Sequence, residues 1–201
     1  MREVLPGIFT WAWPSERHGY HFHGTLVLDP EGNLCIDPAE CGEEVLTRLA
    51  REGVERIVIT NRNHGRAANR VHECTGASVW VHAWDADHAR EQGIGIDETL
   101  EFGERVGPFR VVDAHGKSPG EIALHDARRR LLVVGDAVIG NPPGRLSLLP
   151  EPVLDDPKRL RASLRRLLAL DFDALLVGDG APILADAHAR LEELVASFGD
   201  A

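Results

Sequence analysis

The amino-acid sequence predicts a single mixed α/β domain that spans residues 1–201. Short apolar runs alternate with amphipathic segments along the whole chain, turn residues separate them, and no repeat or long linker divides the two halves. Hydrophobic residues make up 43% of the chain and charged residues 27%, which is typical of globular proteins and not of disordered or fibrous ones. A chain of this length buries a sizeable core without disulfides or metal ions.

The first half of the chain predicts strands that alternate with helices. Apolar runs within the first 40 residues are broken by turns, as at the segment 29–33. Each predicted helix stops at a glycine, Gly53 or Gly76, because glycine readily adopts the left-handed conformation that ends helices. The predicted strands are 24–28, 34–36, 56–60 and 79–82, and the predicted helices are 43–51 and 67–75.

The second half repeats this alternation. Two of its strands form a hairpin through the polar connection 126–130. The segment 141–157 is rich in proline and leucine and predicts an irregular loop, for which a lid and a dimer contact both stay open. The predicted strands are 109–113, 122–125, 131–134 and 174–177, and the predicted helices are 157–170 and 185–198.

Composition excludes several classes of function. The net charge of −10 and the lack of a long basic run argue against binding to nucleic acid. No signal segment and no apolar stretch of membrane-spanning length is visible, so a cytoplasmic protein without membrane contact is expected. Three cysteines in a chain of this size do not predict a disulfide framework. A homo-oligomer is compatible with all of this.

Four polar turns directly follow predicted strands, and such turns are where sites assemble in α/β folds. The first is Thr60-Asn61-Arg62-Asn63-His64-Gly65-Arg66 and the second is Gly116-Lys117-Ser118-Pro119-Gly120. The third is Gly135-Asp136-Ala137 and the fourth is Gly178-Asp179-Gly180-Ala181-Pro182. An earlier strand ends in Leu34-Cys35-Ile36-Asp37-Pro38.

The order and spacing of these five segments resemble the metallo-β-lactamase superfamily. In that family the corresponding segments read Thr-His-x-His-x-Asp-His, Gly-His-Ser-Pro-Gly, Gly-Asp-Ala and Gly-His-Gly-x-Pro, with an early strand ending in Ile-Asp. The resemblance covers residues from about 3 to 195. It implies a four-layer αββα sandwich, in which two mixed β-sheets are flanked by helices and a metal site lies at one edge.

The residues that would bind metal differ from the family pattern. Asp136 alone keeps its family identity, and Gly65 replaces a ligand aspartate. Every histidine-ligand position is substituted, namely Asn61, Asn63, Arg66, Lys117 and Asp179. Zinc needs three or four His, Cys or carboxylate ligands, amides bind it poorly, and a fixed positive charge repels it. No metal cofactor is therefore expected.

The substituted residues predict an internal replacement for the metal. Lys117 and Arg66 would supply two positive charges beside the negative charges of Asp136 and Asp179, with Asn61 and Asn63 hydrogen-bonded among them. The chain has only two lysines and five asparagines, so finding them at former ligand positions is informative. We expect a cluster of salt bridges and hydrogen bonds in the volume that metal occupies in the family.

Three functions follow as hypotheses. The favoured one is a degenerate, metal-free member, a pseudoenzyme in the metal-dependent sense, that binds a small molecule, regulates or has an unidentified activity. The alternative is a hydrolase of esters, thioesters or related substrates, which is the chemistry that the resemblance implies. It would use zinc or another divalent metal on Asp136 and Asp179, or metal-free acid–base chemistry by His64, Lys117 and Asp136. A structural subunit of an oligomer is the third.

Three further histidine positions carry open alternatives. His64 lies at a variable position of the family pattern, so it is either a base in the cleft or a surface or structural residue. His21 and His23 alternate at strand spacing and face the same side. They either line the cleft, where the two could also bind a metal ion as a pair, or belong to a solvated strand face.

Overall fold

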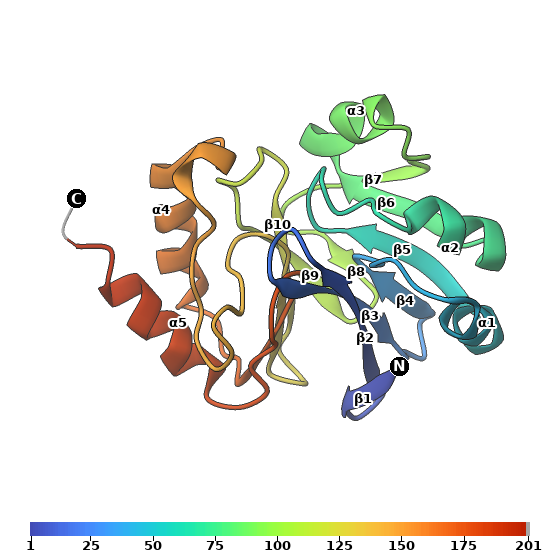
Figure 1. The fold of residues 1–201 in the computed structure, drawn as a ribbon, viewed down its shortest axis with the longest axis horizontal. Coiled ribbons are helices and arrows are strands. Elements are labelled where there is room, and N and C mark those ends of the chain that lie inside the picture. Colours follow the sequence, from blue (N-terminus) through green and yellow to red (C-terminus); the bar gives the residue numbers. More distant parts are fainter. Residues whose placement is uncertain (200–201) are drawn as a thin grey trace.

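A computed structural model describes residues 1–199, which form a four-layer αββα sandwich. Figure 1 shows two β-sheets stacked in the middle, with helices covering both outer faces. The fold class predicted from the sequence is confirmed. No helix within residues 1–199 is long and apolar enough to cross a membrane.

The first sheet has seven strands that lie side by side in chain order. Strands joined by tight turns are antiparallel, and strands joined through helices are parallel, because a parallel pair needs a long crossover. The sheet is thus antiparallel from β1 to β4 and parallel from β4 to β7. Its strands are β1 (Arg2–Leu5), β2 (Ile8–Ser15), β3 (Tyr20–Val27), β4 (Asn33–Ile36), β5 (Val54–Ile59), β6 (Ser78–His82) and β7 (Glu98–Leu100).

The second sheet has five strands in the order β12-β11-β10-β9-β8. Only the pair of β11 and β12 is parallel, and a helix lies between these two strands in the sequence. The predicted hairpin is confirmed as β10 and β11. The strands are β8 (Arg105–Val106), β9 (Phe109–Asp113), β10 (Ile122–Asp126), β11 (Leu131–Val134) and β12 (Ala174–Val177).

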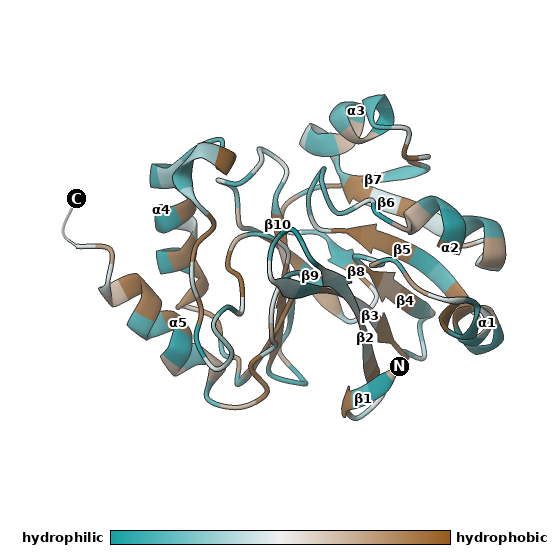
Figure 2. Cartoon of the chain, viewed as in Figure 1, coloured by the Kyte–Doolittle hydropathy of each residue, from teal (hydrophilic) through white to brown (hydrophobic). Residues whose placement is uncertain are grey.

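Within residues 1–199, five α-helices form the two outer layers, and their polar faces point outward (Figure 2). As predicted, α1 and α2 end at left-handed glycines, Gly53 and Gly76. The helices are α1 (Glu43–Glu52), α2 (Ala68–Thr75), α3 (Ala83–Glu91), α4 (Pro157–Leu167) and α5 (Ala187–Ala196). A short 3-10 helix, Glu151–Val153, interrupts the otherwise irregular 141–157 loop.

Three hydrophobic clusters hold the layers together. One lies between the sheets and includes Ile36, Phe109 and Leu176. The second packs the seven-stranded sheet against α1 and α2, and the third packs the five-stranded sheet against α4 and α5. Because the layers bury their apolar faces on one another, the polar loops are left at the edges of the sandwich.

The sequence-based prediction needs correction at five elements. It assigned no structure to α3, whose buried residues are small or polar, such as Ala86 and Asp85, so that no apolar stripe marks the helix. It also lacked the short strands β7 and β8. The two last helices are shorter than predicted, since α4 ends at Leu167 and α5 spans only Ala187–Ala196.

Candidate functional site

The polar segments singled out in the sequence meet at one edge of the sandwich. The carboxyl ends of β4 and β5 bring loops from the seven-stranded sheet, and those of β11 and β12 bring loops from the five-stranded sheet. The side chains that meet there are Asp37, Asn61, Asn63, His64, Arg66, Lys117, Glu121, Asp136 and Asp179, which we call the ionic cluster. All of them except Arg66 and Asn63 are classed as buried.

His64 is the centre of the ionic cluster. Its Nδ1 atom lies 2.8 Å from Oδ2 of Asp37, and its Nε2 atom lies 3.2 Å from Oδ1 of Asp136. The residue is 0% exposed, so a surface position for His64 is wrong. Room for the ring comes from Gly178, where an added Cβ atom would lie 2.4 Å from the imidazole.

Asp37 fixes the orientation of the His64 ring. The Asp37 carboxylate accepts a 2.7 Å hydrogen bond from the Thr60 backbone N–H and a 2.6 Å bond from the Thr60 hydroxyl. These bonds hold the carboxylate in place before it receives the imidazole N–H. The sequence analysis noted Asp37 as a landmark of the fold and did not place it in the site.

Arg66 and Asp179 form an ion pair within the ionic cluster. Nη2 of Arg66 lies 2.6 Å from Oδ1 of Asp179, and the guanidinium stacks 4.0 Å above the ring of Phe22. The same Nη2 atom lies 3.1 Å from Nε2 of His64. Both charged side chains are largely buried, so solvent screens their attraction only weakly.

Lys117 also lies where the sequence analysis expected a cation. Its ammonium donates a 2.7 Å hydrogen bond to Oδ1 of Asn63 and lies 3.6 Å from Oδ2 of Asp136. Asn61 accepts from the Asn63 backbone N–H at 2.9 Å and so orders this loop. The Nδ2 atom of Asn61 is buried and has no hydrogen-bond partner among residues 1–199.

Glu121 is a member of the ionic cluster that was missed in the sequence. Its Oε1 atom accepts hydrogen bonds from the backbone N–H groups of Asp136 and Ala137, at 2.7 and 2.9 Å. Burial, and then the Asp136 charge, raise the pKa of Glu121 well above its ordinary value. The Glu121 side chain thus supports the turn that presents Asp136. The only signal in the sequence was an acidic residue entering an apolar strand.

The electrostatics of the ionic cluster centre on His64 and Asp136. Burial and the Arg66 guanidinium lower the pKa of His64, but the carboxylates of Asp136 and Asp37 outweigh them and raise it to about 10. Burial raises the pKa of Asp136, but His64, Lys117 and Arg66 outweigh it and hold the pKa well below the ordinary range. At neutral pH the imidazolium of His64 therefore faces the carboxylate of Asp136.

His21 and His23 lie outside the ionic cluster. They are on β3 and share one face of the sheet, as their spacing predicted. His21 is exposed, and His23 lines a separate groove at the edge of β2. Burial, and then the nearby charges of Asp179 and Asp136, raise the pKa of Tyr20 to about 12.

Three residues of the ionic cluster have the geometry of a metal-ligand set. One ligand atom each from His64, Asp136 and Asp179 lies within 4.8 Å of the other two. Of these three residues, the sequence had suggested the two aspartates as metal ligands but not His64. Arg66 contacts two of these residues, His64 and Asp179, and Lys117 lies 3.6 Å from the third, Asp136.

Comparisons with known proteins give the same architecture. A family profile described as "Metallo-beta-lactamase superfamily" matches residues 2–198. The solved structure of TTHA1623 in a di-iron-bound form is 26% identical, with a TM-score of 0.71 over 90% of this chain and 98% of that one. A metallo beta lactamase from Erythrobacter litoralis is 16% identical, with a TM-score of 0.77 over 98% and 96% of the two chains.

A metallo-beta-lactamase family protein from Thermus thermophilus, TTHA1429, is a third similar structure. It is 20% identical and has a TM-score of 0.71, over 97% of this chain and 80% of that one. At such identities the last two structures establish the fold alone.

Proposed function

The chain belongs to the metallo-beta-lactamase superfamily, and from this premise we propose that its ionic cluster takes the place of a catalytic metal site. On this proposal the protein binds a small molecule or regulates, and it does not perform metal-dependent hydrolysis. The protonated His64 and the side chains of Arg66 and Lys117 supply the positive charge that a metal ion would otherwise supply.

The contacts of Arg66 and Lys117 carry the proposal. Arg66 lies 2.6 Å from Asp179 and 3.1 Å from His64, and Lys117 lies 3.6 Å from Asp136. A metal ion bound by His64, Asp136 and Asp179 would lie beside these two fixed cations. At a separation of 4 Å and an effective dielectric constant of 20, each contact with a divalent ion costs on the order of 8 kcal/mol. The donor set therefore fits a metal ion poorly.

Gly65 gives independent support. A Cβ atom added at Gly65 would lie 2.6 Å from Cγ1 and 2.7 Å from Cδ1 of Ile94. A carboxylate at this position, as the resembled family has, requires Ile94 to move. The space that a side chain at position 65 would enter is filled by an aliphatic side chain that cannot bind a cation.

The ionic cluster also has a mechanical consequence. The pairs of His64 with Asp136 and of Arg66 with Asp179 each join a loop of the seven-stranded sheet to a loop of the five-stranded sheet. Such buried pairs hold a specific geometry even where desolvation offsets their attraction. In this proposal the cluster fixes the loops that surround the cleft in place of a metal ion.

The second candidate is a hydrolase with a rearranged metal site. One observation favours it, because His64, Asp136 and Asp179 lie close enough together to share an ion. The similar protein TTHA1623 has been solved in a di-iron-bound form. Metal binding would require His64 to lose the proton on Nε2 and Arg66 to turn away from Asp179. The three residues would then hold a Lewis acid that polarises an ester or thioester carbonyl.

Metal analysis of the purified protein separates the two candidates. The protein is produced with added zinc, iron and manganese and is then desalted. Its metal content is measured by mass spectrometry. The proposal expects well below one equivalent of any transition metal, and no chelator-sensitive hydrolysis of ester or thioester substrates. Stoichiometric metal together with chelator-sensitive hydrolysis would establish the second candidate.

A matched variant sharpens this experiment. Replacing Arg66 and Lys117 together by methionine removes the two fixed cations and keeps most of the side-chain volume. If these cations exclude metal, the double variant should bind zinc more tightly than the parent protein, as measured by calorimetry. A parent protein that binds zinc as tightly as the variant would contradict the proposal.

A further inference from the structure

Part of β2 is paired on one side only. β1 lies at the edge of the seven-stranded sheet and pairs with β2 no further than Thr10. Beyond Thr10, β2 pairs with β3 on one side, and no strand among residues 1–199 lies on its other side. Ala12, Trp13 and Pro14 are all exposed there. We call the unpaired side of residues 11–15 the β2 edge.

The backbone of Ala12 points toward the β2 edge. Ala12 lies opposite His23, whose backbone N–H donates a 2.7 Å hydrogen bond to the Gly178 carbonyl oxygen on the far side of β3. Residues directly opposite each other in an antiparallel pair either bond to each other or both point away. The N–H and C=O of Ala12 therefore point away from β3. No backbone group among residues 1–199 bonds to them.

The backbone of Pro14 points the same way. Pro14 lies opposite His21, whose carbonyl oxygen accepts a 2.8 Å hydrogen bond from the Gly180 N–H on the far side of β3. Proline has no N–H to donate, so it is tolerated in a sheet where its nitrogen faces an unpaired edge. The β2 edge therefore presents one N–H donor, from Ala12, and two C=O acceptors, from Ala12 and Pro14. These groups have the spacing that a further antiparallel strand needs.

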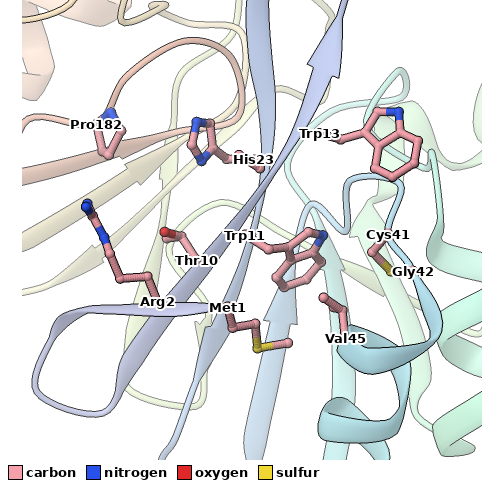
Figure 3. A pocket seen from close by; sticks show the side chains of 11 residues that line it. Met1, Arg2, Thr10, Trp11, Trp13, His23, Cys41, Gly42, Val45 and Pro182 are labelled. Atoms are coloured by element: carbon pink, nitrogen blue, oxygen red, sulfur yellow. The ribbon is translucent and has the colours of Figure 1, made fainter.

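Two hollows meet at the β2 edge. The larger, of about 640 Å³, has Arg2, His23 and Pro182 on one side of the strand and Trp13 on the other (Figure 3). The smaller, of about 360 Å³, lies along the β2–β3 hairpin and shares Ala12, His23 and Pro182 with the larger. Open space therefore lies next to the unpaired backbone and leaves room for an extended chain.

An added strand would meet a different environment on each face of the sheet. Its side chains would alternate between the face that carries Ala12 and Arg2 and the face that carries Trp13. Arg2 is exposed, and no lining residue of either hollow is Asp or Glu, although the chain has 32 acidic residues. Trp13 is 43% exposed, so its indole offers an apolar surface. Charge complementarity and apolar contact thus favour a segment in which acidic and apolar residues alternate.

A second copy of this chain would fit the β2 edge poorly. An antiparallel copy with Ala12 opposite Ala12 would place its Pro14 beside Thr10, where Arg2 of β1 already lies. A copy with its Pro14 opposite Ala12 would leave the Ala12 C=O without a donor, because proline lacks an N–H. A short segment without proline meets neither obstacle.

We propose that the β2 edge binds an extended acidic segment of another protein, which adds a strand to the seven-stranded sheet. An acidic residue of the segment lies opposite Ala12, exchanges both backbone hydrogen bonds with it and points toward Arg2. The next residue is apolar and packs on Trp13. This inference goes beyond the proposed function and does not depend on it, because neither hollow is lined by a residue of the ionic cluster.

Fluorescence anisotropy with dye-labelled peptides tests the mode of binding. The probe is the capped peptide Leu-Glu-Leu-Glu-Leu, and its charge control is Leu-Lys-Leu-Lys-Leu. In the proposed register the glutamate N–H groups face β2 and the leucine N–H groups face solvent. We expect saturable binding of the acidic peptide, which the lysine peptide should show about tenfold more weakly or not at all. N-methylation of both glutamates should cost about tenfold or more, whereas N-methylation of the last two leucines should have little effect.

Three results with these peptides would overturn the proposal. One is the absence of saturable binding by the acidic peptide, and another is equal binding of the lysine peptide. The third is an equal loss from the two methylation patterns, which would show that no strand is added. All these measurements use the parent protein, so they do not depend on whether a variant folds.

A matched pair of variants locates the site. Ala12→Pro removes the one N–H that faces the β2 edge and spares the bonds to β3, so it should weaken the acidic peptide about tenfold. Ala12→Ser keeps this N–H and should bind like the parent protein, and thermal melting checks that both variants are folded. Equal affinities of the two variants would place binding elsewhere. A dimer of the parent protein that Ala12→Pro dissociates, seen by sedimentation, would assign the edge to a second copy and also overturn the proposal.

A second pair of variants tests the charge. Arg2→Gln should reduce the preference for the glutamate peptide over the lysine peptide. Arg17→Gln is the control, because Arg17 is exposed on the β2–β3 turn and lines neither hollow. Equal effects of the two variants would reduce the preference to net charge and contradict the proposed contact. The metal analysis described above is a separate measurement, so either idea can fail alone.

Discussion

Arg66 donates a 2.6 Å hydrogen bond to Asp179 across the junction of the two sheets. Arg66 belongs to the loop after β5, and Asp179 to the loop after β12. In the resembled family both positions carry metal-ligand histidines that are tied together through the ion. In this protein the two side chains are tied directly, and the following predictions test what that contact and its neighbours contribute.

The Arg66–Asp179 pair should show strong energetic coupling. Because both side chains are mostly buried, Arg66→Met or Asp179→Asn alone leaves an uncompensated charge and should cost about 3–5 kcal/mol of unfolding free energy. The double variant should lose much less than the sum. Urea denaturation of the four proteins gives the coupling energy, and additive losses would mean that the two charges do not interact.

Lys117 should matter to stability, and the other lysine should not. Lys117→Ala removes the ammonium next to Asp136 and the donor to Asn63, so we expect a loss of about 1–3 kcal/mol, or several degrees in Tm. Lys158→Ala is the control, because Lys158 is exposed at the start of α4. Calorimetric scans should separate the two variants. An unchanged Tm for Lys117→Ala would show that the cluster does not need this cation.

The protonation of His64 should make stability fall at alkaline pH. Its folded pKa of about 10 lies above the unfolded value near 6.5, so its stabilisation is complete below pH 6.5 and is lost as the pH rises toward 10. In this range the unfolding free energy should fall by up to about 1.4 kcal/mol per pH unit from His64. The measurement is urea denaturation at several pH values, and His64→Gln should flatten the dependence.

The protonation of His64 can also be measured directly in the parent protein, so the test does not depend on whether the His64 variant folds. In nitrogen-15 NMR spectra of the parent protein at pH 8, His64 should show both ring nitrogens protonated. His23, with its pKa lowered to about 4, provides a neutral ring for comparison in the same spectrum. A neutral His64 at pH 8 would contradict the proposed role of the imidazolium.

Glu121 should act as a hydrogen-bond acceptor and not as a charge. Its pKa is raised, and its Oε1 atom accepts from the N–H groups of Asp136 and Ala137. Glu121→Gln keeps a carbonyl acceptor and should change stability by less than about 1 kcal/mol. Glu121→Ala leaves two buried N–H groups unpaired and should cost about 2–4 kcal/mol. Equal losses in both variants, measured by urea denaturation, would show that the negative charge is what matters.

Removal of metal should leave the protein unchanged. If protein cations occupy the former metal site, incubation with EDTA and then desalting should shift the Tm by less than about 1 °C, because no bound ion contributes to stability. Adding zinc back should have no effect either. A fall in Tm with EDTA that zinc reverses would show that the fold depends on a bound ion.

Much of the architecture could be predicted because it depends on short-range patterns. The β-branched run in β5, the amphipathic spacing of α1 and the glycine that ends it are all local features. The prediction failed for α3, where buried Asp85 accepts hydrogen bonds from Arg62 and Gly120. A buried carboxylate with distant partners leaves no apolar period in the sequence.

The residues of the candidate site divide in the same way. Asn61, Asn63, Arg66, Lys117, Asp136 and Asp179 were found because each occupies a motif position beside a strand end. Asp37 and Glu121 were missed because their roles depend on backbone N–H groups that the folded chain brings to them. His64 was named, but the direction of its side chain was left open.

By itself, the sequence determined the αββα layers, the edge at which polar loops gather, and the replacement of histidines by charged and amide side chains. Only the tertiary structure decided that His64 turns inward and bridges Asp37 and Asp136. The direction of a side chain in an irregular loop is set by the space and the partners around it. Here the space beside Gly178 and the carboxylate of Asp136 both come from the opposite sheet, more than 70 residues away in the chain.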